Sequence, residues 1–178
     1  MGHKINYKIL SDTHLGHSKL VKDQYRPLGF EARILKNCRS LIHPKDVFIC
    51  LGDVSFYNDL YWHEELLDYV PTDSRILILG NHDRRTLSWY YSRGWTFVCN
   101  RLDLFIYGYT FRFSHEPLLG SDMCGADINI HGHLHDGTHR NGARFQNQYL
   151  INIENSFAPY NLKTIAEYYN VLEKRNET

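Results

Sequence analysis

Apolar positions in the first half of the chain follow strand and helix periods in turn. Residues Ile5 to Leu10 alternate between apolar and polar, as a half-buried strand does, and Val47 to Leu51 and Arg75 to Leu79 are apolar runs of strand length. Segments with apolar residues at helical spacing follow these strands, over residues 31–42, 59–70 and 84–92. The alternation predicts right-handed crossover units, with helices covering a sheet.

The second half of the chain carries shorter strand candidates separated by turn residues. They cover residues 96–99, 103–107, 110–114, 127–130 and 148–153, and a last helix is predicted over 162–173. Short strands at this spacing indicate antiparallel pairing. Because no repeat, low-complexity segment or linker interrupts the pattern, we expect one α/β domain over residues 1–178.

Composition narrows the class of protein. A chain of 178 residues can bury about two-thirds of its unfolded surface in one domain, and none of its apolar stretches approaches the roughly 18 residues of a membrane span. The N-terminus lacks the apolar segment of a secretory signal, and the four cysteines lack zinc-knuckle or redox spacing. We therefore expect a soluble cytoplasmic protein with free thiols and no membrane partner. A net charge of zero provides no overall field that attracts nucleic acid, and nothing in the sequence indicates an oligomeric state.

Polar side chains that can bind metals follow five of the predicted strands directly. In open α/β sheets, the crevice outside the carboxyl ends of the strands is where ligands bind, so these segments can meet there. The candidate ligands are Asp12, His14, Asp53, Asn81, His115, His133 and His135.

These residue types indicate a pair of divalent ions. Two extended segments, Asp12-Thr13-His14 and His133-Leu134-His135, each place two donors on the same side of the chain, because strand side chains alternate. Imidazoles, carboxylates and an amide suit Mn, Fe, Zn or Ni and lack the thiolates of a structural zinc site. Seven donors exceed the needs of one tetrahedral ion, and Asp53 is the natural bridge because a carboxylate has two acceptor oxygens. We expect Mn, with Fe, Zn or Ni as alternatives.

Each fragment also has a simpler interpretation. A single Gly-Asp pair is more often a turn than a ligand, and Asn81 alone is typical of an Asx-turn. His63 and His131 are interpreted as hydrogen-bonded core residues. Five such clusters at five strand ends are poorly explained by chance.

The motifs Asp12-x-His14, Gly52-Asp53, Gly80-Asn81-His82-Asp83, His115 and Gly132-His133-x-His135 resemble the motif series of the calcineurin-like metallophosphoesterases. The stretch from Ser11 to His17, with Arg26-Pro27 and Leu51 to Phe56, is similar to a small bacterial and phage branch of that superfamily.

The resemblance implies an α/β fold with two mixed β-sheets in a four-layer αββα sandwich flanked by helices. It implies one ion at Asp12, His14, Asp53 and His135, and a second at Asp53, Asn81, His115 and His133. His82 would support the leaving oxygen, with Asp83 orienting it, and a metal-bound hydroxide would be the nucleophile.

The expected substrate is a phosphate ester. About thirty residues separate Asp83 from His115, which leaves no room for a lid and predicts an open site. We therefore expect a phosphodiesterase acting on a nucleotide or nucleic acid, with a nucleotidase-like phosphomonoesterase as the alternative and a non-catalytic scaffold as a weaker one. Among basic residues near the motifs, His17 and Arg26 are the candidates for binding phosphate oxygens.

Overall fold

The computed structural model describes residues 5–135 and 147–176, with side chains described as far as residue 170, and contains two mixed sheets. The first sheet has the strand order β4-β3-β2-β1-β9. Four of its strands run parallel to their neighbours, and the short β9 lies antiparallel to β1. The strands are β1 (Tyr7–Leu10), β2 (Val47–Cys50), β3 (Ser74–Ile78), β4 (Phe97–Cys99) and β9 (Tyr160–Asn161).

The antiparallel pairing predicted for the strands of the second half of the chain is wrong for most of the second sheet. Only β5 and β6 form an antiparallel pair, whereas β6 pairs with β7 and β7 with β8 in parallel. The predicted strand at 96–99 joins the first sheet instead, parallel to β3. Long connections between β6, β7 and β8 allow the chain to return before each strand begins, which short hairpin turns would not permit. The strands are β5 (Arg101–Ile106), β6 (Tyr109–Ser114), β7 (Ile128–His131) and β8 (Gln148–Leu150).

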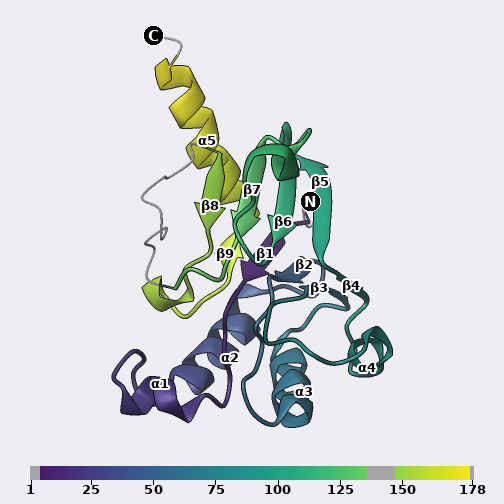
Figure 1. Ribbon diagram of the computed structural model, residues 1–178, viewed down its shortest axis with the longest axis vertical. Helices are drawn as coiled ribbons and strands as arrows, with labels where there is room; N and C mark the ends of the chain where they lie inside the picture. Colours follow the sequence, from purple (N-terminus) through teal and green to yellow (C-terminus); the bar gives the residue numbers. More distant parts are fainter. Residues whose placement is uncertain (1–4, 136–146, 177–178) are drawn as a thin grey trace.

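Helices flank the two sheets, which confirms the expected α/β fold class (Figure 1). Figure 1 shows α2 and α3 side by side beneath the first sheet and α5 at the other end of the molecule. The predicted helix at 84–92 begins later, at Leu87, where the Thr86 side chain caps it by accepting from Trp89 N. The helices are α1 (Ser18–Lys22), α2 (Phe30–Leu41), α3 (Asp59–Tyr69), α4 (Leu87–Ser92) and α5 (Leu162–Asn176), with 3-10 turns η1 (Gly120–Met123) and η2 (Ile153–Asn155).

The core has two layers on either side of the first sheet. Successive strand residues point to opposite faces, so Leu10 belongs to the cluster against α2 and α3, whereas its neighbour Ile9 faces the second sheet. Ile34 of α2 fills the first layer, and Phe111 of β6 fills the second. Burial of both faces explains why β1 and β2 are rich in apolar residues.

Two histidines belong to the interior, as the sequence predicted. His63 is 1% exposed and its Nδ1 accepts from Trp95 Nε1 at 3.0 Å, while His131 is fully buried with Nδ1 2.9 Å from Gly132 O. Within the described part of the chain, no helix has the length and apolar character needed to cross a membrane.

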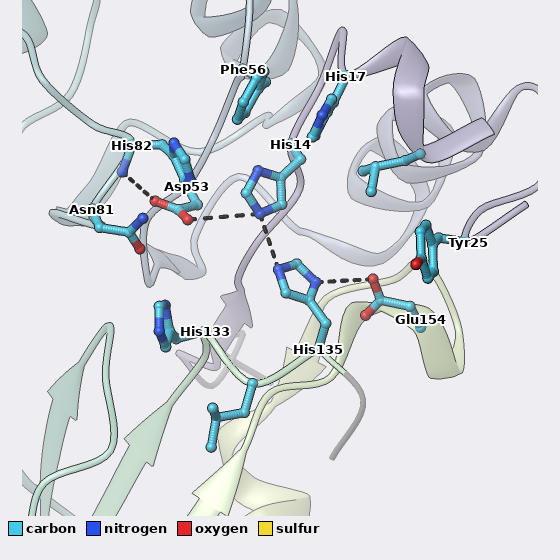
Figure 2. A pocket seen from close by; sticks show the side chains of 12 residues that line it. His14, His17, Tyr25, Asp53, Phe56, Asn81, His82, His133, His135 and Glu154 are labelled. Carbon is cyan, nitrogen blue, oxygen red and sulfur yellow. Dashed lines mark hydrogen bonds and ion pairs between the residues drawn. The ribbon is translucent and has the colours of Figure 1, made fainter. Parts of the chain in front are cut away.

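The parallel strands bring the candidate ligands to one edge of the fold. β1 and β2 are in register to their last residues, Leu10 and Cys50, so the loops that follow leave the sheet together. Leu51 N continues the pairing by donating to Leu10 O at 2.8 Å. The chain segments after β3 and β7 leave their strands toward the same edge, and Figure 2 shows their side chains gathered there. His115, directly after β6, joins them, with its Nε2 2.9 Å from Asn81 Oδ1.

Candidate functional site

The loops after β1 and β2 are tied together by backbone hydrogen bonds. Asp12 N donates to Gly52 O and His14 N donates to Asp53 O, both at 3.0 Å. Gly52, at φ +94°, lies so close to the loop after β3 that an added Cβ would stand 2.4 Å from Gly80 N. The two carboxylate-bearing loops therefore have fixed positions relative to each other and to the third loop.

Four candidate ligands adopt backbone conformations that L-residues seldom occupy. Asp12, His14, Asp53 and His133 have φ values of 52°, 45°, 53° and 67°. Each such residue costs on the order of 1–3 kcal/mol, and strain of this kind gathers at functional sites. Here the left-handed backbone directs the side chains of these four residues toward the same site.

Donor cluster A consists of Asp12, His14 and His135. His14 Nε2 lies 3.1 Å from His135 Nε2, and these two nitrogens lie 4.0 and 3.6 Å from Asp12 Oδ1. Asp12 Oδ1 is buried and has no hydrogen-bond partner among the described residues. An orphaned carboxylate oxygen facing two imidazole nitrogens fits a bound cation, which would satisfy all three atoms.

Donor cluster B consists of Asn81, His115 and His133. His115 Nε2 lies 2.9 Å from Asn81 Oδ1 and 3.1 Å from His133 Nδ1. His115 Nδ1 lies 2.7 Å from Leu51 O, and because a carbonyl only accepts, the ring proton belongs on Nδ1. Nε2 therefore presents a lone pair to other acceptors, which fits a cation in cluster B as well.

Asp53 lies between the two clusters. Its Oδ2 is 3.7 Å from His14 Nε2 of cluster A and 3.5 Å from His115 Nε2 of cluster B. Its Oδ1 accepts from His82 N at 2.9 Å, which fixes the rotation of the carboxylate (Figure 2). Donor atoms of Asp12, His14 and His135, and separately of Asp12, Asp53 and His115, lie within 4.8 Å of one another and could hold a metal.

Burial sets the protonation of cluster A. Desolvation, together with the neighbouring His135 and Arg26, lowers the pKa of His14 to about 2, so the imidazole is neutral and its nitrogens can act as ligands. Burial also raises the pKa of Asp12, although Ser11 Oγ and His133 N donate to its Oδ2 at 2.5 and 2.8 Å. A cation would offset the cost of ionising this carboxyl.

A cavity of about 600 Å³ opens above the clusters, and its size suits a small ligand. His17 and His82, two predicted substrate or catalytic residues, both line it. The ring of His82 is 5.6 Å from that of His14, centre to centre, and 5.0 Å from Phe56. His82 also lines a neighbouring cavity of about 410 Å³ together with Arg84 and Arg85.

Asp83 contacts backbone amides rather than the His82 ring expected from the resemblance. Its Oδ2 accepts from Asp53 N at 2.8 Å and Gly80 N at 2.9 Å, and its Oδ1 accepts from Val54 N at 3.4 Å. Burial raises the pKa of Asp83 to about 6 despite these bonds. The side chain therefore joins the loops after β2 and β3, and positions Asp53 instead of His82.

Arg26 differs from its predicted role as a phosphate contact. Its side chain is only 1% exposed, and its guanidinium donates to Thr13 O at 2.6 Å, Asp12 O at 2.8 Å and Glu154 Oε1 at 2.6 Å. Because its nitrogens donate to groups inside the protein, Arg26 holds the loop after β1, which carries Asp12 and His14, in place.

Glu154 is a site residue that sequence reasoning missed. Its Oε1 lies 3.2 Å from His135 Nδ1, on the side of the ring opposite cluster A, and also accepts from Arg26. The hydrogen bond to Glu154 and the charge of Asp12 outweigh burial and raise the pKa of His135. No motif marks Glu154, which lies in η2, and only the fold brings it behind His135.

Several known proteins are similar to this chain in sequence or in fold. An uncharacterised protein from Methanocaldococcus jannaschii is 26% identical over 164 residues, which are 89% of this chain and 85% of that protein. The crystal structure of a protein of unknown function from Aquifex aeolicus has a TM-score of 0.75 at 22% identity, covering 93% of this chain and 100% of that one. YfcE, a phosphoesterase from E. coli, has a TM-score of 0.50 at 14% identity over 84% of this chain and 79% of its own. These likenesses show a shared fold.

The family comparison covers nearly the whole chain. Residues 5–171 match the family described as calcineurin-like phosphoesterase, and this range includes all the loops at the carboxyl edge of the sheets. The chain therefore belongs to the calcineurin-like phosphoesterase family.

Proposed function

We propose that the protein hydrolyses phosphodiesters of nucleotides or nucleic acids at a centre of two divalent ions. The observation that carries the proposal is the position of Asp53 Oδ2, within 3.7 Å of cluster A and 3.5 Å of cluster B. Asp12, His14, His135 and Asp53 would hold one ion, and Asp53, Asn81, His115 and His133 the other. Family membership supports a hydrolase of phosphate esters.

Divalent ions held by these residues would supply Lewis acidity toward the phosphate and would lower the pKa of bound water to roughly 7. The side chains of the protein hold and orient these ions. His14 presents a neutral imidazole, His115 is oriented by its Nδ1 contact with Leu51 O, Asp12 and Asp53 supply the negative charge, and Asp83 holds the Asp53 loop in place. Mn suits this mixture of nitrogen and oxygen donors, and Fe, Zn and Ni are the alternatives.

His82 is the proposed group that supports the leaving oxygen. It is the cavity-lining histidine whose backbone amide is fixed by Asp53 while its ring stands outside both clusters. A neighbouring imidazole can donate a proton to an oxygen that departs from phosphorus. The His82 ring lies 5.0 Å from that of Phe56, centre to centre, where the two cavities adjoin.

Hydrolysis of bis-p-nitrophenyl phosphate in Mn(II) tests the proposed reaction. The open cavity, flanked by a second cavity across His82, leaves space for groups on both sides of a phosphodiester. We expect faster hydrolysis of the diester than of p-nitrophenyl phosphate, measured as kcat/KM. Strong cleavage of the monoester alone would assign the protein to the phosphomonoesterases.

Two substitutions test the assigned roles. Asp53→Asn should deplete metal and activity together, whereas His82→Ala should lower kcat by roughly 10²–10⁴-fold with metal content unchanged. Asp73→Asn, at an exposed position before β3, is the matched control and should retain both. Loss of metal in His82→Ala would refute the leaving-group role, and metal-free, inactive wild-type protein would favour a scaffold.

We further propose that the protein works in a reducing cytoplasm. Its four cysteines are all free, and Cys38 and Cys50 are buried. Burial raises the pKa of the Cys38 thiol to about 12, which keeps it protonated and unreactive. Quantitative thiol titration of the unfolded protein, isolated without reductant, should find four thiols per chain.

A further inference from the structure

One wall of the main cavity is made of aromatic side chains. His17 and Phe56 lie face to face, with ring centres 3.8 Å apart and planes 4° from parallel. Tyr25 and Leu20 continue this wall along the cavity. We call these four residues the aromatic wall.

The aromatic wall begins beside cluster A. The His14 ring centre lies 6.0 Å from that of His17 and 6.3 Å from that of Phe56. Figure 2 shows His17 and Phe56 above His14, and Tyr25 beside Glu154. A phosphate over the clusters would therefore place the group esterified to it against the wall, with about one sugar ring between them.

Packing in the core does not account for the whole wall. Leu20 does pack against the core layer of α2 and α3, but Tyr25 is 73% exposed and Phe56 is half-buried. Because His17 and Phe56 cover one face of each other, a planar group would stack on the outer face of this pair or on the exposed Tyr25 ring. A flexible aliphatic chain would gain less from parallel rings.

The segment that carries His17, Leu20 and Tyr25 has a fixed position relative to the clusters. Phe56 lies in the loop after β2, where its N donates to Leu15 O at 3.1 Å. Arg26 N donates to Leu20 O at 3.0 Å, and the Arg26 guanidinium binds the carbonyls of Asp12 and Thr13. The same residue therefore anchors both the ligand loop and the α1 segment. A ligand that stacks on this wall would pay little to order it.

We propose that the aromatic wall is a subsite for the nucleobase of the substrate, so that the enzyme prefers esters of nucleosides to esters of simple sugars. The inference rests on the proposed function, because the phosphate must lie over the two clusters for the base to reach the wall. Stacking is sequence-tolerant, since every base has a flat face. The wall therefore selects the presence of a base rather than its identity.

Calorimetric titration tests the subsite without requiring turnover. The probes are the non-hydrolysable phosphonate analogues of AMP and of ribose 5-phosphate, added to the full chain loaded with Mn(II). They share the anionic group and the sugar and differ only in the base. We expect the AMP analogue to bind roughly tenfold more tightly, which is the effect of one base on an aromatic side chain.

Variants assign the preference to the wall. Phe56→Leu and Tyr25→Leu should reduce the ratio of the two dissociation constants toward one, and Tyr25→Leu, at an exposed position, should not disturb folding. Phe105→Leu, an exposed substitution in β5, is the matched control and should keep the wild-type ratio.

The possible failures are distinguishable. Equal binding of both analogues by the wild type would overturn the base subsite and leave the proposed function intact. A base preference unchanged in both wall variants would likewise overturn it. If neither analogue binds in the presence of Mn(II), both the subsite and the proposed phosphate centre are wrong.

Discussion

Replacing Glu154 with glutamine removes one charge from behind cluster A and keeps the shape of the side chain. Glu154 Oε1 accepts from Arg26 Nη2 at 2.6 Å and Nε at 3.0 Å, and contacts His135 Nδ1 at 3.2 Å. Glu154→Gln therefore acts on a buried guanidinium and on a candidate metal ligand at once. Both effects follow from one carboxylate oxygen.

The size of the effect follows from burial. The Arg26 side chain is 1% exposed and that of Glu154 is 27% exposed. Removing one partner of a fully buried pair costs about 3–5 kcal/mol, and partial exposure of Glu154 reduces this to about 2 kcal/mol of unfolding free energy. A neutral amide oxygen accepts more weakly from His135 Nδ1 than a carboxylate does, which should also weaken binding of the ion at cluster A by roughly 10–100-fold.

Glu64→Gln is the matched control for Glu154→Gln. Glu64 also pairs with an arginine at 2.6 Å, but its side chain and that of Arg93 are 52% and 28% exposed. The control should lose about 1 kcal/mol or less. Urea unfolding in a chelator measures stability, and titration with Mn(II) measures affinity. Equal destabilisation by both variants would show that burial does not strengthen the pair of Arg26 and Glu154. Unchanged Mn(II) binding in Glu154→Gln would show that Glu154 does not support His135 as a metal ligand.

Two further predictions concern the backbone and the core. Gly52 and Gly108 have similar φ values, 94° and 88°, so Gly52→Ala and Gly108→Ala should each lose about 1–2 kcal/mol to backbone strain. An added Cβ also meets Gly80 N, at 2.4 Å, only at Gly52, so Gly52→Ala should be the less stable of the two. Metal analysis should therefore find loss only in Gly52→Ala, and equal metal content would contradict this steric argument. Burial lowers the pKa of His63 from 6.5 to about 4, so the folded protein holds it neutral. Its contribution, about 3 kcal/mol, is fully present above pH 6.5 and is lost as pH falls toward 4. His63→Asn, which can still accept from Trp95, should flatten urea-measured stability between these pH values, whereas a slope like that of the wild type would show that His63 is not the group responsible.

The elements of the fold were predictable, but the direction of several strands was not. Apolar periods correctly indicated β1, β2 and β3 and the helices after them, because burial on both faces leaves a local signal. The parallel pairing of β6, β7 and β8 depends on contacts between distant segments, which periodicity does not encode. α1 and β9, with 5 and 2 residues, are too short to show a period.

In the site, too, some residues were predictable from the sequence and others were not. Residues placed directly after strands were predictable as a group, and the structure brings Asp12, Asp53 and His115 together. Their supporting partners were not, because Arg26 and Glu154 meet across 128 residues of sequence. Asp83 contacts amides instead of His82, since a buried carboxylate needs donors and the loops after β2 and β3 supply them.

Crystals grown with Mn(II) test whether Asp53 joins two metal ions, because the anomalous scattering of the metal locates each ion. We expect two peaks roughly 3.5–4 Å apart, one at cluster A and one at cluster B, with Asp53 between them. A single peak, or peaks away from Asp53, would contradict this expectation.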